Sequence, residues 1–249
     1  MIVGIFLGLA VGLVSSLLSL GGSIILVPTI PTFTSLTLKE SVPLSIFIVN
    51  LVTAQNSYFY YRKKLIDLEF IKKTFIPLSL LSYLSAYLSS YVSKRFCLFL
   101  LLVIFILMAI RLLKKTSIEL PKRRKKIILS IAILLSGSLS GLIGMGNGLV
   151  LAPCLLAFNL MPHQKISPTI NLSIFLGGLF SLVGFISNGQ LVSLISNNIT
   201  FILSVTLTSM VSSYFGRKVN NKISQDWRKK ITLVLIIAMF IQTLLKVIN

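Results

Sequence analysis

The fold is decided by one stretch that occurs twice, first as Gly12-Leu-Val-Ser-Ser-Leu-Leu-Ser-Leu-Gly21-Gly22-Ser23-Ile-Ile-Leu-Val-Pro28. The second copy, 125 residues later, is Gly137-Ser-Leu-Ser-Gly-Leu-Ile-Gly144-Met-Gly146-Asn147-Gly148-Leu-Val-Leu-Ala-Pro153. Each copy predicts an apolar helix, a break at small residues and a second, short apolar helix, because glycine destabilises a helix interior. In a membrane such a break survives only where protein or a wet cavity surrounds the freed backbone groups. Both copies are therefore candidate functional sites.

The composition indicates an all-α, polytopic membrane protein. The chain has 249 residues, of which 55% are hydrophobic and 12% are charged, and its mean hydropathy is +0.95. Although the net charge is +19, no nucleic acid partner is expected, because the charges form short clusters between apolar runs, as in cytoplasmic membrane loops. No metal site and no cofactor are expected, since His163 is the only histidine.

Apolar segments of helical length follow the same plan in both halves. A basic linker at 114–126 separates a first repeat, 1–113, from a second repeat, 127–249. The expected segments are 2–20, 23–33, 42–61, 70–92 and 96–113 in the first repeat, and 127–145, 149–160, 169–186, 194–215 and 231–247 in the second.

The basic residues favour a topology in which each glycine-broken piece enters the membrane and returns. In that arrangement 20 of the 24 lysines and arginines lie on one side, and only Lys39, Lys94, Arg95 and Lys246 lie on the other. The positive-inside rule makes the 20-charge side cytoplasmic. Each repeat then has one broken hairpin plus three spans, an odd number of crossings, so the second repeat is inverted relative to the first, as in many secondary transporters.

Neutral donors are the candidates for substrate binding. The five acidic residues all fall in loops or at the ends of spans, which argues against a carboxylate-based cation site inside the membrane. Helices that begin at the breaks present free N–H groups and a positive dipole end, which suit an anion. The predicted substrate-binding residues are Ser19, Gly21, Gly22, Ser23, Asn50, Gly144, Gly146, Asn147, Gly148 and Asn171.

These residues also have purely structural interpretations. Glycine and serine in membrane helices often only permit close packing, and Asn50 and Asn171 are equally compatible with hydrogen bonds between helices. The basic loops are topology determinants that attract anionic lipids by the same charge. Duplication at matched positions, with a proline downstream of each break, favours the functional interpretation of the breaks.

The duplicated pattern in Ser19 to Pro28 and Gly144 to Pro153 resembles the TauE/SafE family of sulfite-exporter-like membrane proteins. The resemblance extends from about Gly4 to the last span, and it includes the basic central linker. The sequence departs from the family's glycine-rich pattern at Ser19, Ser23 and Asn147. The resemblance implies transport of sulfite, organosulfonates or related small sulfur-containing anions across the cytoplasmic membrane.

The sequence thus predicts a multi-pass transporter of the cell membrane that exports a small anion by alternating access at paired broken helices. A passive anion channel and a non-transporting membrane scaffold are the alternatives. No enzymatic activity is expected, because the chain lacks a Ser–His pair, paired aspartates or a metal set within its spans. The partners expected are the small anion, the bilayer and anionic lipids, and the sequence is also compatible with a homodimer.

Overall fold

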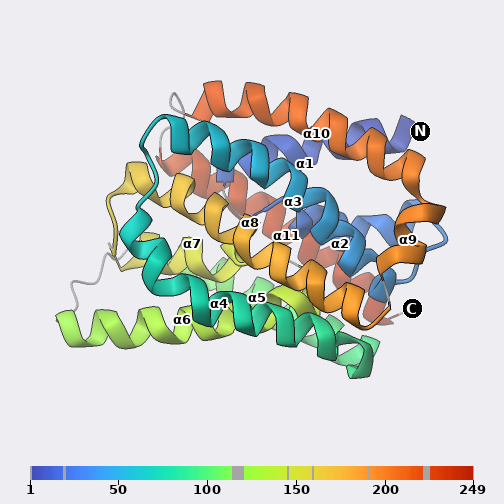
Figure 1. The fold of residues 1–249 in the computed structure, drawn as a ribbon, viewed down its shortest axis with the longest axis horizontal. Coiled ribbons are helices and arrows are strands. Elements are labelled where there is room, and N and C mark those ends of the chain that lie inside the picture. Colours follow the sequence, from blue (N-terminus) through green and yellow to red (C-terminus); the bar gives the residue numbers. More distant parts are fainter. Residues whose placement is uncertain are drawn as a thin grey trace.

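The computed structural model describes residues 2–18, 21–113, 121–144, 146–158, 160–189, 191–220 and 225–248, and all the regular structure in them is helical (Figure 1). The first half contains α1 (Ile2–Leu18), α2 (Ser23–Phe33), α3 (Leu38–Arg62), α4 (Leu68–Leu88), the short 3-10 turn η1 (Ser89–Tyr91) and α5 (Lys94–Leu113). The second half contains α6 (Lys122–Ile143), α7 (Gly148–Ala157), α8 (His163–Ser187), α9 (Leu191–Asn197), α10 (Ile199–Asn220) and α11 (Gln225–Ile248).

The helix bounds repeat at the offset read from the sequence. The ends of α1 and α6, the starts of α2 and α7, and both bounds of α3 and α8 are each 125 residues apart. After α8 the offset grows to 131, because α9 adds a short helix that the first half lacks. The sequence pattern does not distinguish α9 from the span predicted at 194–215. It also assigns residues 122–126 to the linker, whereas α6 begins at Lys122.

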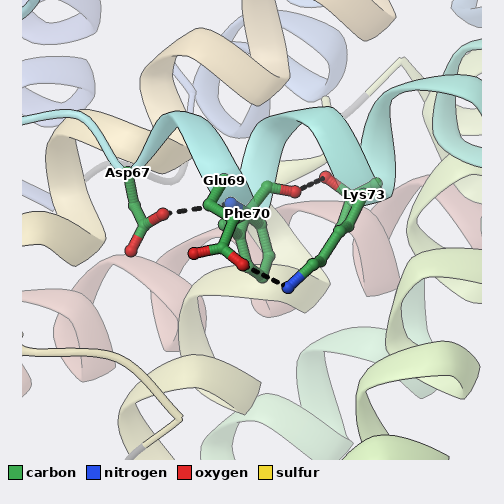
Figure 2. Close-up of polar contacts among 5 residues, drawn as sticks. Asp67, Glu69, Phe70 and Lys73 are labelled. Atoms are coloured by element: carbon green, nitrogen blue, oxygen red, sulfur yellow. Dashed lines mark hydrogen bonds and ion pairs between the residues drawn. The ribbon is translucent and has the colours of Figure 1, made fainter.

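Polar groups at the helix starts fix where α3 and α4 begin. Thr37 and Glu40 form a reciprocal capping box, in which the Glu40 carboxylate accepts the Thr37 N–H at 2.7 Å. The Asp67 carboxylate accepts the Phe70 N–H at 3.0 Å, and in the same first turn of α4 Glu69 pairs with Lys73 at 2.6 Å (Figure 2). Such caps satisfy N–H groups that a helix leaves without partners.

Small residues let two pairs of parallel helices approach closely. Gly4, Gly8 and Gly12 of α1 face Ser204, Thr208 and Ser212 of α10 in the same order along the chain, and the Ser212 hydroxyl donates to the Gly8 carbonyl at 3.2 Å. Helices α6 and α4, which correspond to α1 and α10 in the repeat, pair in the same way. Gly137 and Gly141 of α6 face Leu78 and Ser85 of α4. Small residues of this kind are typical of contacts between membrane helices.

Helices α3 and α8 cross at the centre in opposite directions. Asn50 of α3 contacts Phe175 and Gly178 of α8, whereas Asn56, further along α3, contacts Asn171, which is earlier in α8. In Figure 1, α3 accordingly runs from right to left and α8 from left to right. The first eight residues of α2, 23–30, are all buried, and α2 and α7 share one apolar core with α3 and α8.

Three helical stretches of the described chain are long and apolar enough to cross a bilayer, namely Arg123–Ile143, Gln164–Ser187 and Ile199–Lys218. Shorter apolar stretches occur at Ile2–Ser16, Ser23–Phe33 and Ile236–Leu245. Many large apolar side chains are exposed on the outside, among them Phe6, Leu9 and Leu13 on α1. A molecule that exposes so much apolar surface is suited to lipid rather than to water.

The contact between α1 and α10 gives a test of the fold. A Cβ atom at Gly12 would lie only 2.1 Å from the Ser209 carbonyl oxygen, so we expect Gly12→Val to push α10 away and to destabilise the protein by about 2 kcal/mol or more. The measurement is the thermal unfolding midpoint of the purified protein in detergent. Leu9→Val is the control, because Leu9 lies on the exposed face of the same helix. A midpoint equal to that of the control would contradict the packing.

Candidate functional site

The two chain breaks have related backbone geometry. Gly21 and Gly146, which are 125 residues apart, have φ angles of 73° and 64°, and Gly144, which ends α6, has a φ of 74°. These values lie in the left-handed region, which glycine occupies without steric cost. Gly22 and Asn147 then precede α2 and α7 in the right-handed region. The sequence predicted breaks at these positions, and the structure places them there; Ser19 lies outside the described residues.

The two breaks lie next to each other in space. A Cβ atom at Gly146 would lie 3.7 Å from the Ser23 hydroxyl and 3.3 Å from the Ile174 side chain of α8. The start of α2 in the first half is therefore adjacent to the glycine turn of the second half. This proximity satisfies the requirement that broken backbone be enclosed by protein.

A small cavity lies at this junction. It has a volume of about 10 Å³, which is the room that one water needs. Residues of α2, α3, α6 and α8 line it together with the second break: Ser23, Ile46, Val49, Asn50, Ser140, Gly146, Ile174 and Gly178. Three of the predicted site residues, Ser23, Asn50 and Gly146, therefore converge on one enclosed space.

Two hydroxyls of the cavity have no hydrogen-bond partner in the described part of the chain. The Oγ atoms of Ser23 and Ser140 are buried and are bonded to none of the described residues. A buried polar group without a partner costs free energy and calls for an explanation, such as a ligand or a water. The starts of α2 and α7 add to this, because no side chain caps either helix. The junction thus holds donors that the protein itself does not use.

Asn50 lies at the crossing of α3 and α8. Its Nδ2 atom donates to the Phe175 carbonyl at 2.9 Å, and Phe175 is the residue 125 positions later in the chain. A Cβ atom at Gly178 would lie 2.2 Å from the same Nδ2 atom. Gly178 therefore makes room for Asn50, which both links the two helices and lines the cavity.

Asn147, which the sequence predicts as a substrate ligand, is hydrogen-bonded to two neighbouring helices in this structure. Its side chain is fully buried and donates to the Ser173 carbonyl at 3.1 Å, and its own carbonyl accepts the Ser136 hydroxyl at 2.7 Å. Asn147 is absent from the cavity lining. It therefore connects the start of α7 to α6 and α8, and it shapes the site by positioning the break.

The other predicted residues are distributed around the junction. Gly22 packs against Val11, and Gly144 packs against Val42. Gly148 is the first residue of α7 and is buried. Asn171 lies away from the cavity, toward the end of α3, where its Oδ1 atom accepts from Asn56 Nδ2 at 3.3 Å.

Sequence reasoning missed Ser140 and Gly178 in the cavity and also a buried arginine, Arg217. The repeat offset provides a signal for Ser140, because Ser140 corresponds to Ser15, a hydroxyl of the first copy that is likewise buried without a partner. Arg217 was counted among the loop charges, but only 6% of its surface is exposed. A pattern of charge along the sequence does not indicate which way a side chain at the end of a helix points.

The contacts of Asn147 generate a second test. Asn147→Leu removes the hydrogen bond that links Asn147 to the Ser173 carbonyl of α8, and it places a branched side chain against Gly177. We expect a loss of about 1–3 kcal/mol in stability, read as a lower unfolding midpoint. Asn198→Leu is the control, because the Asn198 amide bonds only to Leu194, four residues earlier. Equal unfolding midpoints for the two variants would contradict the role of Asn147 in connecting the start of α7 to α6 and α8.

Comparison with known proteins gives a consistent result. The family model described as "Sulfite exporter TauE/SafE" matches residues 4–243. A "Probable membrane transporter protein" of Haemophilus influenzae is 23% identical over 244 residues, covering 92% of this chain and 90% of the relative. The "Probable membrane transporter protein YunE" of Bacillus subtilis is 25% identical over 263 residues, covering 93% and 91%. No solved structure matches the chain.

Proposed function

Because the chain belongs to the sulfite exporter TauE/SafE family of membrane transporters, we propose that it exports sulfite, an organosulfonate or a related small anion across the cytoplasmic membrane. The observation that carries the proposal is the cavity between the two breaks. Its unpartnered hydroxyls, Ser23 and Ser140, and the uncapped helix starts offer hydrogen-bond donors to an anion. Ile46, Val49 and Ile174 line the rest of the cavity with apolar surface.

The donors suit an anion because they combine partial positive charge with an enclosed site. The first N–H groups of a helix point outward from its start, and the aligned peptide dipoles add a positive end. Serine hydroxyls rotate and donate to an oxyanion without carrying a formal charge. Such a site binds an anion and still releases it, which a carrier requires.

The mechanism proposed is alternating access by two inverted repeats. Its support is that α3 and α8 occupy equivalent positions in the two halves and run antiparallel, with Asn50 bonded to its equivalent residue, Phe175. In Figure 1, α1 and α3 start at the right, whereas α6 and α8 start at the left. A cavity with room for one water corresponds to a closed state. Rocking of one repeat against the other would enlarge the cavity toward either side.

The proposal extends to orientation and lipid contact. The ends of α3 and α10 and the starts of α4, α6 and α11 lie on one side in the hairpin topology, and these ends carry most of the lysines and arginines. The positive-inside rule assigns that side to the cytoplasm, and anionic lipid headgroups are attracted to it.

The flux of sulfite into proteoliposomes tests the function. We expect saturable uptake of radiolabelled sulfite, and a fall of about tenfold or more in the Ser23→Ala, Ser140→Ala double variant, because both hydroxyls are lost. Ser79→Ala is the matched control, since Ser79 is also a buried hydroxyl without a partner but lies outside the cavity. Flux that rises without saturation would indicate a channel, and unchanged flux in the double variant would reject the cavity as the site.

Cysteine labelling tests the topology. Single cysteines that replace the exposed residues Lys64, Arg124 and Lys230 are expected to react with an impermeant maleimide only from the cytoplasmic side, in a background without Cys97 and Cys154. A cysteine that replaces the exposed Lys39 is expected to react from the opposite side. Labelling of positions 64 and 230 from opposite sides would rule out the inverted repeat.

A further inference from the structure

One arginine of α10 is buried within the helices instead of facing water or lipid headgroups. Arg217 is only 6% exposed, although it lies at the end of the apolar stretch Ile199–Lys218. An arginine in this position ordinarily extends toward the membrane surface, because removing its charge from water is costly. A buried ionisable residue in a membrane helix is therefore a candidate for function.

The partners of Arg217 are neutral. Its Nη1 atom donates to Asn56 Oδ1, which also accepts the Ser213 hydroxyl at 2.7 Å. The guanidinium lies 4.8 Å from the ring centroid of Phe59 and 5.9 Å from that of Tyr214. These contacts cover one edge and the faces of the group, but they do not neutralise its charge.

The Nε edge of the guanidinium has a donor that the described residues do not use. Arg217 Nε is buried and has no hydrogen-bond partner among the described residues. The carboxylates whose side chains the structure describes are engaged elsewhere: Glu40 with Thr37, Asp67 with Phe70 and Glu69 with Lys73. In the described part of the chain, Lys73–Glu69 is the only ion pair. Among the side chains that the structure describes, Arg217 thus has no counter-ion and has one unfilled donor, its Nε–H.

An oxyanion is the ligand that this edge fits. The guanidinium fork matches two oxygens of a carboxylate, phosphate or sulfur oxyanion, and a charged pair in an enclosed site is stronger than a neutral hydrogen bond. Ser213 and Asn56 place a hydroxyl and a rotatable amide beside it. Their neighbour Asn171, which the sequence predicted as a substrate ligand, joins the same group through Asn56.

The position of Arg217 relates this group to the cavity. Asn56 lies six residues after Asn50 on α3, which is about 9 Å along the helix. The equivalent of Arg217 in the first half is Ala86, at the offset of 131 that relates α4 to α10. The charge is therefore present on only one side of the central cavity, the side assigned to the cytoplasm.

We propose that Arg217, with Asn56 and Ser213, forms a second oxyanion-binding site, at which the exported anion is captured from the cytoplasm before it reaches the central cavity. The inference rests on the proposed function. Arg217 Nε is inaccessible in the present state, so the anion pairs with it when the ends of α3 and α10 separate. The buried position places the site among protein helices, and the ligand is a soluble anion instead of a lipid headgroup.

Calorimetric titration of the purified full-length protein with sulfite, methanesulfonate and sulfate tests the site. We expect Arg217→Gln to raise the Kd of the tightest of these anions about tenfold or more, because the charge is removed while a donor to Asn56 remains. Arg217→Lys is expected to recover part of the affinity, since it restores the charge without the fork. Lys218→Gln is the matched control, because Lys218 is the exposed neighbour, and its Kd should stay within about twofold of the parent's.

A second variant, Asn56→Asp, keeps the test decisive if Arg217→Gln fails to fold. Asn56→Asp keeps the arginine and supplies an internal counter-ion at the Oδ1 position, so it should weaken anion binding to a similar extent while it raises the unfolding midpoint. Parental affinity in Asn56→Asp or in folded Arg217→Gln would overturn the site and leave the proposed function standing. Absence of binding and flux in the parent, for all three anions, would overturn both.

The bilayer is varied in a last arm of the same experiment. The Kd of the anion is expected to be the same in maltoside detergent and in nanodiscs with or without phosphatidylglycerol. A Kd that rises with phosphatidylglycerol content in the parent, but does not depend on it in Arg217→Gln, would identify the headgroup as the ligand of Arg217 and would overturn the assignment to a soluble anion.

Discussion

The structure depends on the requirement that backbone N–H and C=O groups be satisfied wherever water is absent. An unbroken helix meets this requirement alone, but α1–α2 and α6–α7 do not, because each pair is interrupted by a glycine turn. The turns must be enclosed by other helices, and α3 and α8 enclose them by crossing at the centre. The same interruption that is costly for the fold leaves helix starts with free N–H groups beside buried hydroxyls, and these groups can bind a ligand.

The outer helices make that enclosure tight. α1 packs along α10 through Gly4, Gly8 and Gly12, and α6 packs along α4 through Gly137 and Gly141. Each contact joins a helix of one half to a helix of the other, so neither half is a separate body. Close approach of this kind depends on van der Waals contact and short polar bonds, since lipid supplies no hydrophobic force between helices. The core around the breaks is thereby shared by both halves.

Much of this arrangement could be predicted from the sequence, because the repeat is strict where the breaks require it. The position of α2 was predicted at 23–33, as found, and the offset of 125 holds for both bounds of α3 and α8. Residues Ser23, Asn50 and Gly146 were predicted to lie together, and they line one cavity. These predictions rest on backbone conformation, because glycines and other small residues mark where a membrane helix is interrupted.

The rest could not be predicted, because it depends on the direction of individual side chains. The sequence predicts Asn147 as a substrate ligand, but it does not indicate that the Asn147 amide lies against Gly177 and bonds to Ser173. The charge pattern predicts that Arg217 and Lys218 both lie in a loop, although only Lys218 is exposed. Adjacent residues on a helix point about 100° apart, so one turn of α10 carries both a surface charge and a buried one. Only the packing of α3 against α10 decides between them.

The positions at which the two halves differ bear on the direction of transport. Two identical inverted repeats would give inward-facing and outward-facing states of equal free energy, and any preference must come from residues that break the symmetry. Two such pairs of equivalent positions lie near the proposed path. Asn147 in the second half corresponds to Gly22 in the first, and Arg217 corresponds to Ala86. In the first pair, the Asn147 amide links the second break to Ser173 of α8, a hydrogen bond that the glycine at position 22 cannot make. The second pair gives one entrance a charge and leaves the other neutral, so an anion would be captured more strongly on the charged side and released more readily on the neutral side. In the proposed mechanism, the symmetric scaffold would supply the two states, and the unequal residues would supply the bias between them.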